Sequence, residues 1–157
     1  MSRSGADLAL LLLGGFRALA EAGSVELAEH GYAKIRPIHD FALRSILGGA
    51  GTTAELAREL GISKQAVTKT ITFLQAEGYV AAGSDERDGR RRVFTVTDRG
   101  LALLRTGEQV FDDLRDRWAQ RIGVDQLERL EEALVDLGIR APTRHDAAGW
   151  LSGSSSE

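Results

Sequence analysis

The chain has 157 residues, a formal net charge of −3, 43% hydrophobic and 27% charged residues, and no cysteine. This length suits one compact domain, and the composition is that of an ordinary globular protein rather than a disordered one. The lack of cysteine excludes a disulfide framework, a thiolate nucleophile and a zinc–thiolate centre.

The first predicted element is a helix over residues 6–30. Its first half is apolar nearly all round, which is typical of a helix buried on more than one side and points to a partner subunit. The longest apolar run, Leu8 to Leu13, is too short for a bilayer core, which needs about 20 residues. An export signal is the alternative, because Arg3 precedes the run and Ala18 to Ala20 resembles a cleavage site. The helical pattern continues past that site, and we expect a buried helix in a cytoplasmic protein without membrane attachment.

Three further helices are predicted from their capping residues. They begin at Pro37, Thr52 and Ser63 and end near Leu47, Leu60 and Gly78. Two short strands, Val80–Ala82 and Val93–Val96, follow, with the hairpin-turn dipeptide Asp88-Gly89 between them. A long helix opens at Thr97 or Asp98 with an apolar stripe formed by Leu101, Leu104, Phe111, Leu114, Trp118 and Ile122. Asp125 and Glu128 have capping-box spacing for a last helix, whose heptad seam is Leu127, Leu130, Leu134 and Leu137.

The segment 52–80 has the spacing of a DNA-binding helix-turn-helix. Ala57 is small where two helices cross, Gly61 allows the turn, and Val67 is the apolar plug behind the second helix. The outward face of that helix is polar or basic, and its members are Ser63, Lys64, Gln65, Thr68, Lys69 and Thr72. Such side chains can contact phosphates and the edges of bases. A merely solvated helix face is the alternative interpretation.

The hairpin that follows carries the arginines Arg87, Arg90, Arg91 and Arg92. Six basic and four acidic residues between 63 and 97 give this region a net charge of +2, so the rest of the chain carries −5. Arg90 is expected near the hairpin tip, where a guanidinium suits a narrow minor groove. Asp85 is placed to pair with Arg87 and stiffen the loop, and a solubilising charged loop is the alternative interpretation.

Three segments together resemble the MarR family of winged helix-turn-helix transcriptional regulators. They are SKQAVTKTITFLQAEGYV (63–80), DERDGR (85–90) and FTVTDRG (94–100). The second matches the family's D-x-R-D-x-R wing motif, and the third resembles its L-T-x-x-G segment at Thr97 and Gly100. The resemblance implies a triangular homodimer joined by the first, fifth and sixth helices. It also implies that the fourth helix enters a major groove, that Arg90 enters the minor groove, and that Asp85 braces the wing.

We therefore expect a mainly α fold with a small β-hairpin wing, in which a winged helix-turn-helix is flanked by N- and C-terminal dimerisation helices. The expected divisions are an N-terminal dimerisation helix and linker at 1–36, a DNA-binding domain at 37–98, C-terminal dimerisation helices at 99–140 and a partly disordered tail at 141–157.

The expected function is that of a ligand-responsive repressor that binds a pseudo-palindromic double-stranded DNA operator as a homodimer. No G-x-S-x-G, H-E-x-x-H or P-loop motif is present, and GGAGTT (48–53) lacks the lysine of a phosphate cradle, so we expect no enzyme and no cofactor. A winged-helix module for protein interactions, without specific DNA binding, is the alternative. A metal site built from His30, His39 and a carboxylate is a weaker one.

A small aromatic or phenolic effector is expected mainly from the resemblance. A cationic, aromatic-lined cleft near the start of the second helix would suit an aromatic carboxylate or a phenol. The candidate residues are Arg17, His30, Tyr32, Arg36 and His39. Surface polar or helix-capping roles for these residues are the alternative.

Overall fold

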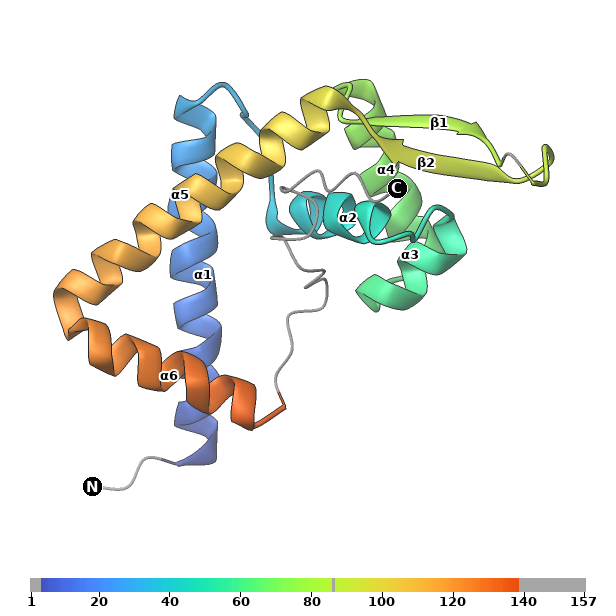
Figure 1. Ribbon diagram of the computed structural model, residues 1–157. Helices are drawn as coiled ribbons and strands as arrows, with labels where there is room; N and C mark the ends of the chain where they lie inside the picture. The colour runs from blue at the N-terminus through green and yellow to red at the C-terminus, as the bar shows by residue number, and fades with distance from the viewer. Residues whose placement is uncertain (1–3, 86, 139–157) are drawn as a thin grey trace, which may run out of the picture.

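The computed structural model describes residues 4–85 and 87–138. These residues form six helices and one antiparallel hairpin, namely α1 (Gly5–Glu29), α2 (Pro37–Leu47), α3 (Thr53–Leu60), α4 (Lys64–Ala76), β1 (Val80–Ser84), β2 (Arg92–Val96), α5 (Asp98–Ile122) and α6 (Val124–Asp136). Two lobes are visible in Figure 1: α1, α5 and α6 form an open triangle, and α2 to α4 with the hairpin lie at the other end of α5. The predicted fold class is confirmed, and the predicted tail at 141–157 lies outside the described residues.

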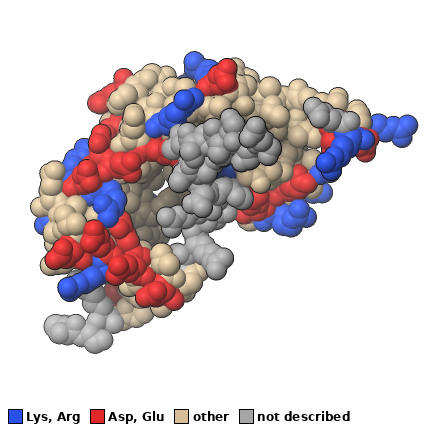
Figure 2. Space-filling view, in the orientation of Figure 1, with Lys and Arg blue, Asp and Glu red and all other residues tan. Residues whose placement is uncertain are grey.

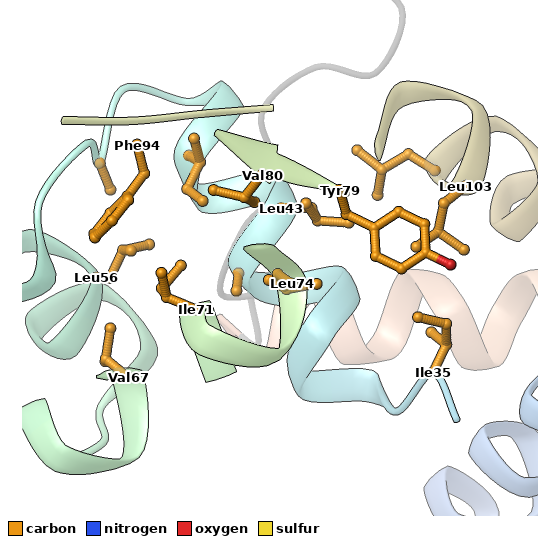
Figure 3. Packing of buried hydrophobic residues seen from close by; sticks show 14 of the residues in the cluster. Ile35, Leu43, Leu56, Val67, Ile71, Leu74, Tyr79, Val80, Phe94 and Leu103 are labelled. Atoms are coloured by element: carbon orange, nitrogen blue, oxygen red, sulfur yellow. The ribbon is translucent and has the colours of Figure 1, made fainter. Parts of the chain in front are cut away.

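The core of the second lobe lies where α2, α3 and α4 meet the base of the hairpin (Figure 3). Leu43, Leu56 and Leu74 have no exposed surface, and Val67 and Ile71 pack beside them. Phe94 of β2 covers the α3 side of this cluster. Val67, the predicted apolar plug behind α4, is therefore buried, and Ile71 and Leu74 lie with it on the inner face, which turns the opposite face of α4 to solvent.

Side-chain caps start α3 and α4 where the sequence predicts them. In α3 the Thr52 hydroxyl accepts a hydrogen bond from the Glu55 backbone N–H, and the Glu55 carboxylate accepts one from the Thr52 N–H. The Ser63 hydroxyl caps α4 by accepting from the Ala66 N–H at 3.1 Å. The capping box predicted at Asp125 and Glu128 is wrong. There α6 begins directly after Gly123, whose φ of 94° turns the chain out of α5 without any side-chain cap.

The junction between the wing and α5 explains the resemblance at Thr97 and Gly100. The Thr97 hydroxyl donates to the Gly78 carbonyl at 2.6 Å and accepts from the Gly100 N–H at 3.2 Å, so it caps α5 and ties it to the end of α4. A Cβ on Gly100 would lie 2.4 Å from the Tyr79 carbonyl oxygen. Only glycine lets α5 approach the backbone of Tyr79, just before β1, this closely.

We expect Gly100→Ala to lower the free energy of unfolding by roughly 1–3 kcal/mol, because the new methyl group meets backbone that cannot move aside. Gly83→Ala is the matched control, since a Cβ at Gly83 meets nothing within 4 Å. Urea denaturation of both variants measures the difference. Equal midpoints for the two variants would contradict this account of the junction.

The wing is longer than predicted and its turn differs in type. The strands pair from Val80 with Val96 to Ser84 with Arg92. The predicted Asp88-Gly89 turn is present, since the Arg91 N–H donates to the Asp88 carbonyl at 2.9 Å. Gly89 does not have a positive φ, so this is not the two-residue turn that the dipeptide usually forms.

The first helix packs on α5 through its second half. Gly23 allows this contact, because a Cβ there would lie 2.7 Å from the Phe111 ring. Arg44 of α2 also joins the two lobes, because its guanidinium donates to the carboxylates of Asp40 in α2 and Glu108 in α5.

The N-terminal half of α1 is largely exposed in the single chain. By length and composition α1 could cross a membrane. It has 25 residues, and an 18-residue window within it reaches a mean hydropathy of 1.5, with 6% of that window buried. A helix of a soluble protein whose apolar face meets another chain has the same composition. The exposed apolar side chains of this lobe include Leu8, Leu10, Leu11, Leu12, Leu13, Phe16, Leu130 and Leu137, which are between 43% and 76% exposed.

Candidate nucleic-acid interface

The outer face of α4 carries all six of the polar residues predicted to contact DNA there. Ser63, Lys64, Gln65, Thr68, Lys69 and Thr72 are exposed. Among the described residues, Lys64, Gln65 and Lys69 have no side-chain hydrogen bond or ion pair within the protein. Their donors and acceptors are therefore available to a ligand.

Both exposed threonines of α4 use their hydroxyl protons inside the helix. Thr68 donates to the Lys64 carbonyl at 2.9 Å and Thr72 to the Thr68 carbonyl at 2.7 Å. Contacts from these residues to a base would therefore use the methyl group, which suits the thymine methyl, or the oxygen lone pairs.

The arginine-rich loop forms the free end of the wing, and Figure 2 shows basic side chains projecting there, away from the α1–α5–α6 triangle. Arg87, Arg90, Arg91 and Arg92 are all exposed. The side chains of Arg87, Arg90 and Arg92 have no partner in the described part of the chain. The wing and the outer face of α4 belong to the same lobe.

The brace expected between Asp85 and Arg87 has a different form. The Asp85 carboxylate accepts from the backbone N–H of Arg87 at 2.9 Å, and no ion pair links the two side chains in residues 4–85 and 87–138. Asp88 makes the same kind of contact with the Arg90 N–H at 3.1 Å. Short acidic side chains fold back on the nearest backbone donors in such loops, so Asp85 supports the wing while the Arg87 guanidinium stays free.

Arg91 is the exception among the wing arginines, because its guanidinium binds the Glu55 carboxylate of α3 at 2.5 Å. The hydrogen bond with Thr52 lowers the pKa of Glu55 below its ordinary value; burial opposes this shift, and the charge of Arg91 lowers the pKa further. Nothing in the sequence relates two residues 36 positions apart.

A cavity of about 860 Å³ lies between α4 and the segment that connects α1 to α2. Its apolar wall is formed by Ile35, Pro37, Ile38, Ile62, Ala66 and Phe73, and its polar groups come from Ser24, Lys34, Arg36, His39, Lys69 and Thr70. Lys34 has a positive φ of 68°, which is uncommon for a residue other than glycine and is often found at binding sites. Three cations beside an apolar wall suit an amphipathic anion.

Of the five residues predicted for an effector site, only Arg36 and His39 line this cavity. Arg17 is exposed on α1, away from the cavity. His30 lies at the end of α1, where its ring Nδ1 is 2.8 Å from the Glu26 carbonyl oxygen. Tyr32 packs towards Tyr79, with ring centroids 6.3 Å apart. His30 and Tyr32 were expected in the site because they lie near His39 in the sequence, and Arg17 because it could lie opposite; none of the three lines the cavity.

His39 is buried and sits between α2 and the cavity. Its Nδ1 accepts the backbone N–H of Arg36 at 3.0 Å, so the neutral ring carries its proton on Nε2. The ring stacks on Phe73 of α4 with centroids 4.2 Å apart. Burial, reinforced by the charge of Arg36, lowers the pKa of His39 to about 4. The histidine therefore links α2 to α4 as a neutral ring, through its stacking on Phe73.

We expect the free energy of unfolding to fall by roughly 1–3 kcal/mol as the pH drops from about 6.5 to about 4. The unfolded chain binds a proton at His39 in this range and the folded chain does not, so acid favours unfolding, and the stability is fully present above pH 6.5. His39→Gln, which keeps an acceptor for the Arg36 N–H, should remove this part of the pH dependence. Urea titrations across the range measure it, with His30→Gln as the control that retains the dependence.

The MarR family model matches residues 42–91, which include α3, α4 and most of the wing. A comparison with curated protein sequences finds no match.

Solved structures extend the likeness to most of the chain. The reduced form of MarR from Escherichia coli superposes with a TM-score of 0.72 at 20% identity, covering 87% of this chain and 98% of that one. The Mycobacterium tuberculosis MarR family protein Rv2887 gives 0.64 at 27% identity over 86% and 96%. Streptococcus pneumoniae FabT, crystallised in complex with DNA, gives 0.69 at 16% identity over 85% and 94%.

Proposed function

Because this chain belongs to the MarR family of winged helix-turn-helix transcriptional regulators, we propose that it represses transcription from a pseudo-palindromic operator that it binds as a homodimer. Proteins of this family are not enzymes. The observation that carries the proposal is the joint exposure of the polar face of α4 and the unpaired arginines of the wing on one lobe. A DNA partner implies a cytoplasmic location.

In this proposal α4 enters the major groove and the wing reaches the adjacent minor groove. Gln65 and Lys69 have free polar groups that suit base edges, and Lys64 lies in the first turn of α4, where a phosphate is favoured. Arg90 lies at the turn of the wing, where its guanidinium can enter a narrow groove. FabT and an E. coli MarR mutant were crystallised with DNA, which supports this mode of binding for the present chain.

The proposed dimer uses α1, α5 and α6. Exposed leucines gather on the first half of α1 and on α6, and together they form a surface that a single chain leaves in water. A two-fold contact between two such triangles would bury this surface and leave both wings pointing outward. We assign residues 1–36 and 99–140 to dimerisation and residues 37–98 to DNA binding on these grounds.

Selection of bound sequences from a random DNA pool tests the proposed function. We expect an enriched motif with two inverted half-sites about one helical turn apart, roughly 34–36 Å. A gel shift with DNA that flanks the gene for this chain gives a second measure. If neither experiment detects sequence-specific binding, a winged-helix module for protein interactions is the better interpretation.

We further propose that a small aromatic or phenolic anion in the cavity beside His39 releases the operator. Its ring would lie on Ile38, Ile62 and Phe73, and its anionic oxygen would be bound by Lys34, Arg36 or Lys69. Lys69 is both exposed on the outer face of α4 and part of the cavity, so a bound anion would withdraw a cation from DNA. A preference of 1–3 kcal/mol for the non-binding arrangement would lower DNA affinity about 5–150-fold.

Titration of the protein–operator complex with benzoate and with phenol tests the effector proposal. We expect benzoate to weaken DNA binding more than phenol, which is uncharged near neutral pH, and Arg36→Gln to raise the benzoate concentration that is needed while leaving operator affinity without benzoate nearly unchanged. If operator affinity stays within twofold across the titration and in His39→Ala, the effector proposal is wrong and the DNA-binding proposal is unaffected.

A further inference from the structure

We propose that Arg91 is a positioning residue, which holds the wing in place through its ion pair with Glu55 and does not contact DNA. The proposal rests on the DNA-binding function proposed above. Among the described residues, Arg91 is the one wing arginine whose side chain is bound within the protein. Its partner Glu55 lies in the first turn of α3, so the pair joins the wing to the first helix of the helix-turn-helix.

The backbone of Arg91 fixes the loop that presents Arg90. Its N–H donates to the Asp88 carbonyl at 2.9 Å and closes the turn, and its carbonyl accepts from the Asp85 N–H at 2.9 Å and closes the loop. Any displacement of Arg91 therefore moves the turn that carries Arg90. Anchoring the side chain of Arg91 anchors the free end of the wing.

Two other contacts attach the same part of the wing to the α2–α3 turn. The Phe94 N–H donates to the Gly51 carbonyl at 2.8 Å, which continues the sheet by one backbone hydrogen bond. Val93 packs where a side chain on Gly51 would stand, since a Cβ there would lie 2.6 Å from its Cγ1. The ion pair is the outermost of these attachments and the closest to the turn of the wing.

Glu55 is suited to be an anchor because its carboxylate is already held. One oxygen accepts from the Thr52 N–H at 3.0 Å in the capping box, and the other accepts from Arg91. An exposed ion pair usually contributes little, in part because two long side chains must be ordered. Here the capping box already orders the Glu55 side chain, so forming the ion pair orders only the side chain of Arg91.

The two possible roles of Arg91 predict opposite effects of Glu55→Gln. If Arg91 contacted a phosphate, Glu55 would compete for it, and removing that negative charge would tighten DNA binding. If Arg91 positions the wing, the same substitution loosens the wing and weakens binding although the protein becomes less acidic. Glutamine also serves at this position of a capping box, so α3 keeps its cap.

We expect Glu55→Gln and Arg91→Gln each to weaken operator binding roughly 2- to 30-fold. The effect is modest because an exposed ion pair contributes little, and each substitution removes two such pairs from a dimer. The double variant should bind no more weakly than the weaker single variant. Hydrogen exchange of the Phe94 amide should become faster in both single variants. Arg92→Gln is the matched control: it removes a free arginine at the next position and should weaken DNA binding while leaving the Phe94 exchange rate unchanged.

Tighter operator binding by Glu55→Gln, or additive losses in the double variant, would overturn the proposal and return Arg91 to the DNA contacts. Unchanged Phe94 exchange in both single variants would also overturn it. Hydrogen exchange needs no DNA, so it decides the role of the ion pair even if the protein binds no operator, in which case the proposed function fails on its own.

Discussion

A charge placed on the exposed leucine surface of α1 should abolish the dimer and with it most of the DNA affinity. We expect Leu12→Glu to sediment as a monomer and to bind the operator about 10²- to 10⁴-fold more weakly, because two linked recognition helices gain that much from binding together. Leu12 is 44% exposed in the single chain, so a glutamate there does not disturb the core of the subunit. Analytical ultracentrifugation and fluorescence anisotropy measure the two effects.

The control for this experiment is Leu47→Glu, which places the same charge on an exposed leucine of the other lobe. It should remain a dimer. If Leu12→Glu is also a dimer with unchanged affinity, then α1 does not form the subunit interface and the exposed leucines need another explanation.

Loss of the arginine at the turn of the wing should have the next largest effect. We expect Arg90→Ala to weaken operator binding by about 1–3 kcal/mol and to flatten the dependence of affinity on salt concentration. The guanidinium of Arg90 has no partner within the described residues, so its charge is available to DNA. Affinities measured between 50 and 200 mM salt test this, since several phosphate contacts predict a fall of roughly 10³- to 10⁵-fold in the unaltered protein.

Arg121→Gln is the matched control, because it removes the same charge from the far end of α5, where α5 meets α6. It should leave the salt dependence unchanged. Equal slopes for Arg90→Ala and the unaltered protein would mean that the wing does not approach DNA.

Local chemistry made much of the fold predictable. Thr52 and Ser63 start helices where a hydroxyl can cap free backbone N–H groups, and the inward positions of α4 follow the helical repeat. Gly61 ends α3 with a φ of 65°, as a turn between two crossing helices requires. These features depend on residues close together in the sequence, so the sequence alone could specify them.

Contacts between distant segments were not predictable in this way. The pairing of Arg91 with Glu55 spans 36 positions, and the cavity joins Ser24 of α1 to Lys69 of α4. The cap predicted at Asp125 was wrong because a glycine with positive φ lets α6 follow α5 directly. His30 and Tyr32 were expected beside His39 because they are near it in sequence, but His30 contacts the end of α1 and Tyr32 packs towards Tyr79, so nearness in sequence is a poor guide there.

A hydroxyl-radical and methylation-interference footprint of the dimer on its selected operator tests most directly whether α4 and the wing of each subunit bind adjacent grooves of DNA. We expect two major-groove contact regions about one helical turn apart, each with a minor-groove contact on its outer side that Arg90→Ala removes. A single contact region, or minor-groove contacts that persist in Arg90→Ala, would contradict this expectation.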